Sequence, residues 1–510
     1  GFSLDWERTD VPWEIWLERS RVTGAVNIAD AKIDGLLALD GSRFEAAIDM
    51  ERLDVKQNLF LRGKAHFGCD LNLRGAQVGG TLEMDGSRFE ATLDMQGLEV
   101  RQALFLRNNA YFGCTVMLHS AKVDGQLDAG GSRFKAMLNM ERLEVGQDLS
   151  LADKAHFGGD VTLQGAKVGG QLGASGSCFK AALNMQGLEV KRGLFLRDKA
   201  HFAGPVDLIG AKIGDILQLC GSTWLGPVDM TAARVTGELH LASSKWPVPE
   251  WGEMAGLVLR SARLGALQDS HGDGKDAWPK KLDLHGCRIE ALGGFQGDDD
   301  ASDMLARPAS YWVDWLARGT KERFSPQPYQ MIARLLREAG YPTKANAVLY
   351  AARKRERGSF LGLINAAKIQ IVLLKKFLSI QEFANKSGTT EPQAFWHPIY
   401  LWTLYLTIGF GIGRYFLRHV AGWLLFWTGL GTLMLQYCGN DQLTEKSIWW
   451  KIAASLDRLI PFAELIPRLS QTLKDSLTDG QQLYFAGHSL VGWVLAAMVV
   501  AGLAGLTQRA

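Results

Sequence analysis

The sequence has little proline, few cysteines and almost no net charge for its 510 residues. Its 56 Lys and Arg balance 54 Asp and Glu, which argues against a dedicated nucleic-acid binder. The 6 cysteines form no CxxC pair and no Cys/His metal spacing, so a zinc site is excluded and unpaired thiols are expected. Only 14 prolines accompany 57 glycines, and this mixture predicts regularly spaced corners rather than disorder.

The N-terminal half contains an ungapped 45-residue repeat. Within each repeat, apolar residues come in pairs two positions apart, as in Leu37/Leu39 and Leu59/Leu61, and such pairs point to one face of an extended strand. Successive pairs are too close together for a helix between them, so the chain must turn a corner after each short strand. The same step relates a series of alanines, a series of aromatic residues and a series of corner glycines: Ala31, Ala76, Ala121, Ala166 and Ala211; Phe44, Phe89, Phe134, Phe179 and Trp224; Gly41, Gly86, Gly131, Gly176 and Gly221.

Four short strands and four corners make one coil of 22 or 23 residues, and two coils make the repeat. The sequence therefore predicts a right-handed quadrilateral parallel β-helix, a solenoid whose coils stack about 4.8 Å apart. We expect it to cover residues 20–295, after an N-terminal cap over residues 1–19.

Polar residues also recur at this step on the outside of the predicted coils. Members of one series are two coils apart, about 9.6 Å, so they cannot share a metal ion. Two hypotheses remain, a solvated polar ladder and a binding stripe for an extended partner. The candidate residues are Arg43, Arg88 and Arg133 in one series, and His66, His156 and His201 in the other, which also includes Tyr111.

A helical connector is predicted after the repeat. A linker with a short helix occupies residues 296–328, an αα-hairpin residues 329–358 and an amphipathic interfacial helix residues 359–394. The basic residues in these segments are candidates for contact with anionic lipid headgroups, which makes membrane lipids an expected partner. They are Arg353, Lys354, Arg355, Arg357, Lys375 and Lys376.

The last part, residues 395–510, is predicted to form an α-helical transmembrane domain. Three apolar stretches, 396–417, 420–437 and 484–506, are long enough to span a bilayer, and residues 447–467 form an amphipathic stretch. The distribution of Lys and Arg predicts a multi-pass protein of the inner membrane with the β-helix in the cytoplasm. Candidate pore or interface residues are Arg414, Asp457, Arg458 and His488.

The repeat resembles pentapeptide-repeat proteins, although its faces alternate between five and six residues. Together with the tail, as in Gly492-Trp493-Val494-Leu495, it resembles a bacterial group commonly labelled "membrane-associated oxidoreductase". The resemblance implies a β-helix fused to a small membrane domain. It supplies no catalytic motif.

Two functions from different classes remain. The first is a non-enzymatic sensor or interaction scaffold, coupled to a membrane bundle that forms a pore if the chain assembles into a homo-oligomer. The second is an oxidoreductase, whose best version places a haem between two of His397, His419 and His488. No catalytic, cofactor or metal residue is assigned, no cofactor is expected, and a protein partner on the β-helix is preferred to nucleic acid.

Overall fold

The computed structural model describes residues 4–243, 245–269, 276–293, 304–319, 324–356, 413–437, 443, 445–460 and 477–503. The chain divides into two compact units, Gly1–Arg323 and Phe324–Ala510. We call the first the solenoid and the second the helical unit, and describe each by itself.

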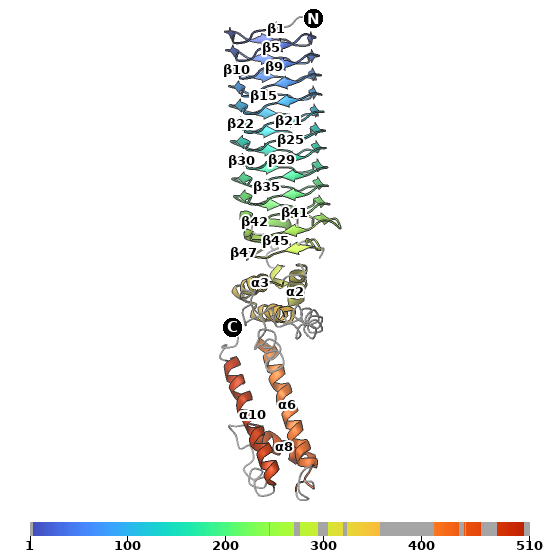
Figure 1. Cartoon of the computed structure of the whole chain (residues 1–510), viewed down its shortest axis with the longest axis vertical. Coiled ribbons are helices and arrows are strands. Elements are labelled where there is room, and N and C mark those ends of the chain that lie inside the picture. Colours follow the sequence, from blue (N-terminus) through green and yellow to red (C-terminus); the bar gives the residue numbers. More distant parts are fainter. Residues whose placement is uncertain are drawn as a thin grey trace, which may run out of the picture. The chain divides into compact units, whose positions relative to one another are not determined.

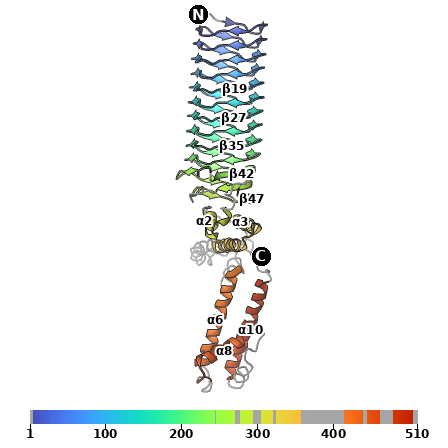
Figure 2. The same ribbon diagram turned by 180° about the vertical axis from the view of Figure 1, so that it is seen from behind.

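The solenoid is built from coils of four two-residue strands (Figures 1 and 2). A representative coil contains β9 (Ile48–Asp49), β10 (Asp54–Val55), β11 (Leu59–Phe60) and β12 (His66–Phe67), after which β13 (Leu71–Asn72) pairs in parallel with β9. Partners are 22 or 23 residues apart, as the repeat predicted. The predicted solenoid with four strands per coil is confirmed. Its right-handedness stays a prediction.

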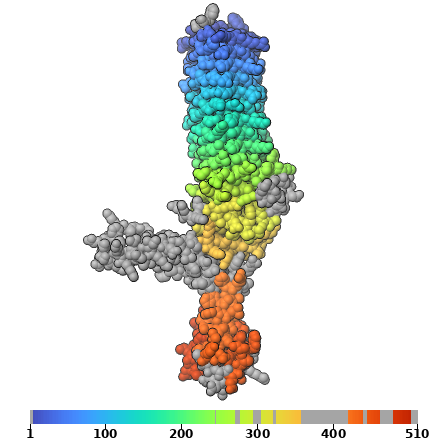
Figure 3. All heavy atoms as spheres, turned by 90° about the vertical axis from the view of Figure 1, so that its right-hand side faces the viewer, coloured from blue at the N-terminus to red at the C-terminus, as the bar shows by residue number. Residues whose placement is uncertain are grey.

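The strands of successive coils form three continuous parallel sheets in the described residues. Sheet A contains β9 and β13, sheet B contains the β10 and β11 positions of every coil, and sheet C contains the β12 position. Figure 3 shows the coils as bands in chain order. The strands of sheet C are β4 (Arg21–Val22), β8 (Arg43–Phe44), β12, β16 (Arg88–Phe89), β20 (Tyr111–Phe112), β24 (Arg133–Phe134), β28 (His156–Phe157), β32 (Cys178–Phe179), β36 (His201–Phe202), β40 (Thr223–Trp224) and β43 (Glu250–Trp251).

Residues 4–16, within the predicted cap, contain strands of a first coil: β1 (Leu4–Asp5), β2 (Asp10–Val11) and β3 (Ile15–Trp16) pair with β5 (Val26–Asn27), β6 (Lys32–Ile33) and β7 (Leu37–Ala38). All five corner glycines of the repeat have φ between +63° and +73°. Because an L side chain is strained there, glycine at these corners has a conformational cause.

The core of the solenoid is a column of inward side chains that includes one stack of aromatic rings. The two aromatic series of the repeat interleave along sheet C, so neighbouring ring centroids are 4.2–5.2 Å apart from Phe44 to Trp224. These rings are at most 1% exposed. Each phenylalanine is therefore held by the coils on both sides.

The coils change shape toward residue 293. The strands β42 (Arg234–Ala242), β45 (Arg263–Asp269) and β47 (Arg288–Leu292) are longer and pair side by side. Helix α2 (Ala309–Ala317) packs here, where Trp315 meets Trp278 edge to face. The buried carboxylate of Asp269 lies 2.8 Å from Arg307 and accepts hydrogen bonds from Trp278 and Tyr311.

The helical unit begins with α3 (Gln327–Glu338), followed after Gly340 by a helix over residues 342–356, where the hairpin was predicted. Three further helices contact one another: α6 (Gly413–Tyr437), α8 (Ile448–Leu459) and α10 (Asp479–Leu503). Ser447 caps α8, accepting from the Trp450 N–H. The predicted interfacial helix, 359–394, lies outside the described residues.

The prediction of a transmembrane domain is wrong for the described residues. None of the helices described there combines the length and the apolar character needed to cross a bilayer. The predicted spans 420–437 and 484–506 were recognised by their lack of charge. That criterion overestimates apolar length, because α6 and α10 also contain glycine, threonine, glutamine and His488. The span 396–417 lies mostly outside the described residues.

The predicted location in the inner membrane is also wrong. A multi-pass protein of the inner membrane, with the β-helix in the cytoplasm, required membrane-spanning segments, and the described residues provide none. The rule of positive charge on the inner side applies only to loops that flank such segments, so the distribution of Lys and Arg has no bearing here.

Candidate binding face on the solenoid

The two outward series predicted from the repeat lie on one face of the solenoid, sheet C. Strand β12 pairs with β8 and β16, so His66 stands beside Arg43 and Arg88. Further along, His156 lies between Arg133 and Cys178, and His201 follows Cys178. The arginines and histidines were predicted as separate columns. The alternation of 22 and 23 residues in the repeat is the signal that the two series interleave at one-coil spacing.

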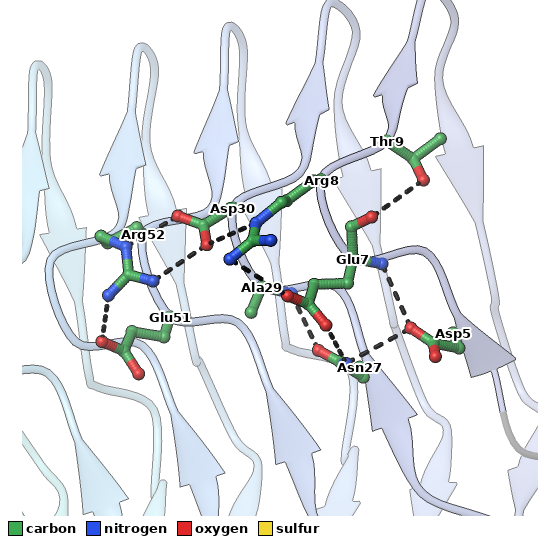
Figure 4. Close-up of polar contacts among 9 residues, drawn as sticks. All are labelled: Asp5, Glu7, Arg8, Thr9, Asn27, Ala29, Asp30, Glu51 and Arg52. Atoms are coloured by element: carbon green, nitrogen blue, oxygen red, sulfur yellow. Dashed lines mark hydrogen bonds and ion pairs between the residues drawn. The ribbon is translucent and has the colours of Figure 1, made fainter.

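Charges on the first coils are neutralised by neighbours. Asp30 accepts two hydrogen bonds from Arg52, at 2.7 and 2.9 Å, and lies 3.7 Å from Arg8 (Figure 4). The hydrogen bonds from Arg52 hold the pKa of Asp30 below its ordinary value. On sheet C, Arg21 and Arg43 both pair with Glu45, at 2.9 and 3.0 Å.

The pairing on sheet C follows an Arg-x-Glu pattern that stops halfway along the solenoid. Arg88 pairs with Glu90 as Arg43 pairs with Glu45, and Arg88 also covers the ring of Tyr111 at 4.0 Å. In the next two repeats, lysine replaces the glutamate, giving Arg133/Lys135 and then Cys178/Lys180. The replacement removes one negative charge and adds one positive charge at each position.

The result is a patch of exposed cations, which we call the basic face: Arg133, Lys135, Lys154 and Lys180. Within the residues that the structure describes, none of the four has an ion pair. His156 lies among them. Partial burial, followed by the charges of Lys180, Arg133 and Lys135, lowers the pKa of His156. The histidine is therefore neutral at pH 7 and adds no charge to the patch.

A hollow of about 610 Å³ adjoins the basic face at the corner between sheets B and C. Its lining includes Gly130 and Gly131, where the chain turns from β23 (Leu127–Asp128) into β24. Asp128 accepts the Gly130 N–H at 2.8 Å and lies 3.7 Å from Arg107. The other side chains that line it belong to Asn108, Asn109, Tyr111, Ser132, Arg133, Asp153, Lys154 and His156.

A second hollow, of about 380 Å³, lies on sheet B. Phe195 and Ile216 provide its apolar surface, and Arg192, Asp215 and Glu238 its charges. Glu238 is buried and pairs with His240 at 2.8 Å. The charges that line this second hollow are of both signs, in contrast to those of the basic face.

The candidate residues of the helical unit are dispersed. Arg353 pairs with Glu356 at 3.1 Å, and Arg355 donates to the hydroxyl of Tyr329. Lys354 lies on the same helix. Arg357, Lys375 and Lys376 are outside the described residues, as are His397 and the side chain of Arg414.

The candidate pore residues lie inside the helix bundle. Asp457 is 7% exposed on α8, and the carbonyl of the adjacent Arg458 accepts from Ser489. His488 is 1% exposed, and its Nε2–H donates to the Ser455 carbonyl at 3.2 Å. Its Nδ1 has no partner in the part of the chain described. Burial lowers the pKa of His488, so the ring packs as a neutral group among Trp427, Tyr484 and Phe485.

The described ranges contain no candidate metal site and no cysteine with a lowered pKa. No group of three or more His, Cys, Asp or Glu there has the arrangement to hold a metal ion. The described cysteines are free, and burial raises the pKa of Cys114 to about 11 and of Cys220 to about 12, so both are protonated.

Comparison with protein families, with characterised proteins and with solved structures finds no match to this chain.

Proposed function

We propose that the solenoid is a non-enzymatic interaction scaffold, and that its basic face binds an extended, acidic segment of a partner protein. The observation that carries the proposal is the loss of the Arg-x-Glu pattern. Where Glu45 and Glu90 neutralise their arginines, Lys135 and Lys180 leave the cations unpaired. Unpaired charges on neighbouring coils repel one another, and a bound anion relieves that repulsion.

The rigid solenoid supports this role. Coils repeat at about 4.8 Å, so the cations stand in fixed positions and lose little freedom when a partner binds. Salt bridges at an exposed surface are individually weak, and several acting together are needed for useful affinity. The face should therefore determine association rate and specificity more than affinity.

A protein partner is favoured over nucleic acid. Asp153, which has no ion pair among the described residues, lines the same hollow as Arg133 and Lys154, and it would repel a continuous phosphate backbone. A protein segment can place neutral or basic residues opposite this carboxylate. The whole chain also has a net charge of only +2.

The test is binding of a dye-labelled peptide of alternating glutamate and serine to the full chain, measured by fluorescence anisotropy at several salt concentrations. Lys135→Glu with Lys180→Glu restores the pairing pattern and should abolish binding. The matched control, Arg234→Glu with Arg263→Glu, makes the same change in charge at two exposed positions of sheet B, on β42 and β45, and should bind normally.

Loss of binding in the control, or no binding by the unmodified chain, would contradict the proposal. Tighter binding of single-stranded poly(dT) than of the peptide would assign the face to nucleic acid instead.

A further inference from the structure

The hollow at Gly130 occupies the place of an ion pair that the two preceding repeats contain. In the first repeat, both the backbone N–H and Nε of Arg62 donate to Asp40, at 3.2 and 3.0 Å. In the second, Arg107 donates to Asp85 in the same way, at 3.2 and 2.9 Å. Each aspartate thus closes its corner and satisfies the backbone N–H of the following coil.

Both members of this pair are missing from the third repeat. Gly130 stands where Asp40 and Asp85 stand, and Ala152 stands where Arg62 and Arg107 stand. The loss of two side chains opens the hollow. It also leaves the Ala152 N–H without the carboxylate that its equivalents bond, and no other acceptor for it lies among the described residues.

A buried hydroxyl at the same hollow is independently left without a partner. Ser132 lines the hollow and is 1% exposed, and its Oγ has no hydrogen bond in the described structure. Of the equivalent hydroxyls, Ser42 accepts the Ser20 N–H at 3.0 Å and Ser87 accepts the Ala65 N–H at 3.1 Å, whereas Ser177 in the next repeat has no partner in the described structure either. What distinguishes Ser132 is that it lines the hollow, where a ligand group could supply the partner that this buried hydroxyl lacks.

The charge of the hollow favours an anion. Arg107, Arg133 and Lys154 carry positive charge there, against the two carboxylates of Asp128 and Asp153. Because Asp128 is already engaged by Gly130 and Arg107, the charged groups of the hollow that remain without ion pairs in the described residues are Arg133, Lys154 and Asp153, and their sum is one positive charge.

We propose that this hollow is the anchor point of the basic face, and that it takes one carboxylate side chain of the partner in the place where Asp40 and Asp85 stand. The partner would complete the solenoid's own pattern, with its carboxylate accepting from the Ala152 N–H beside Arg133 and Lys154. This inference rests on the proposed scaffold function and specifies how the partner is registered along the face.

The decisive variant is Gly130→Asp, which supplies the carboxylate from the chain itself. A Cβ at Gly130 would lie 3.0 and 3.1 Å from carboxylate oxygens of Asp128 and Asp153, the flexible ends of side chains, and no positive φ is required there. The variant should fold. The matched control is Ser175→Asp, which adds the same charge at the equivalent corner of the next repeat.

Two measurements on the full chain test the anchor. Gly130→Asp should bind the glutamate–serine peptide about tenfold more weakly, the effect of losing one hydrogen-bonded charged contact, whereas Ser175→Asp should change binding less than about twofold. Amide hydrogen exchange at Ala152 should slow when the unmodified chain binds the peptide. It should already be slow in free Gly130→Asp.

The outcomes separate the two proposals. If Gly130→Asp binds the peptide as the unmodified chain does, or if exchange at Ala152 is unaffected by the peptide, the anchor is wrong. The scaffold function would still stand if the double lysine variant had lost binding. If the unmodified chain does not bind the peptide, both proposals fail.

Discussion

At the scale of single residues, the solenoid depends on side chains held between adjacent coils. Phe134 is fully buried, and its ring stacks on those of Phe112 and Phe157 at 4.6 and 5.2 Å. Each ring in the column therefore contributes to two interfaces between coils. This is the nearest-neighbour coupling expected of a solenoid.

Replacement of Phe134 by alanine should lower the free energy of unfolding by about 3–5 kcal/mol, because it removes apolar burial and leaves a cavity between two rings. Denaturant titration followed by circular dichroism measures the effect. The control, Met137→Ala, changes a side chain that is 38% exposed on the same coil and should shift stability by about 0.5 kcal/mol or less. Equal effects would contradict the account of the core.

His488 makes the stability of the helical unit sensitive to pH. Burial lowers its pKa below the ordinary value of 6.5, so in acid the unfolded chain takes up a proton that the folded chain resists. The contribution of neutral His488 to the free energy of unfolding is therefore fully present above about pH 6.5. It decreases as the pH drops from there toward the lowered pKa.

We expect thermal melts monitored by tryptophan fluorescence to show this loss between pH 7.5 and 5.5. The variant His488→Phe should show a smaller dependence over the same range, because it has no group to titrate. An unchanged dependence would mean that other groups are responsible.

At the scale of the element, the last strands and α2 are tied by one buried ion pair. Asp269 on β45 is 2% exposed and lies 2.8 Å from Arg307, next to Trp278 and Tyr311. Burial, with the nearby charge of Asp269, raises the pKa of Tyr311, so its hydroxyl stays a donor.

Removing the carboxylate with Asp269→Ala should destabilise the solenoid by about 3–5 kcal/mol, because it leaves Arg307 without compensation in a buried site. Asp54→Ala breaks an exposed pair with Lys56 and should cost at most about 1 kcal/mol. Denaturant titration of the two variants compares them directly. Similar costs would show that the pair does not hold α2 in place.

At the scale of the whole molecule, the charge of one face changes from balanced to positive along the solenoid while the fold stays constant. The backbone of β8, β16, β24 and β32 is the same, and only the outward residues differ. Position along the solenoid can therefore carry recognition without any change in structure. A partner that binds Lys135 and Lys180 but not the coils with Glu45 and Glu90 would have its position along the solenoid set to within one coil.

The membrane prediction failed at this same scale. Runs without charge at 420–437 and 484–506 predicted spans, whereas the described α6, α8 and α10 pack against one another and bury polar groups such as Ser455 and His488 between them. A run without charge does not distinguish a bilayer from a protein interior, because both exclude water.

The sequence alone determined the solenoid. A strict period, paired apolar residues and corner glycines predict short strands separated by corners, because successive apolar pairs lie too close together for a helix between them. The tertiary structure alone decided where the hollow at Gly130 lies. Its lining residues come from neighbouring coils, such as Tyr111, Arg133 and His156, because parallel pairing of the strands brings residues 22 or 23 positions apart side by side.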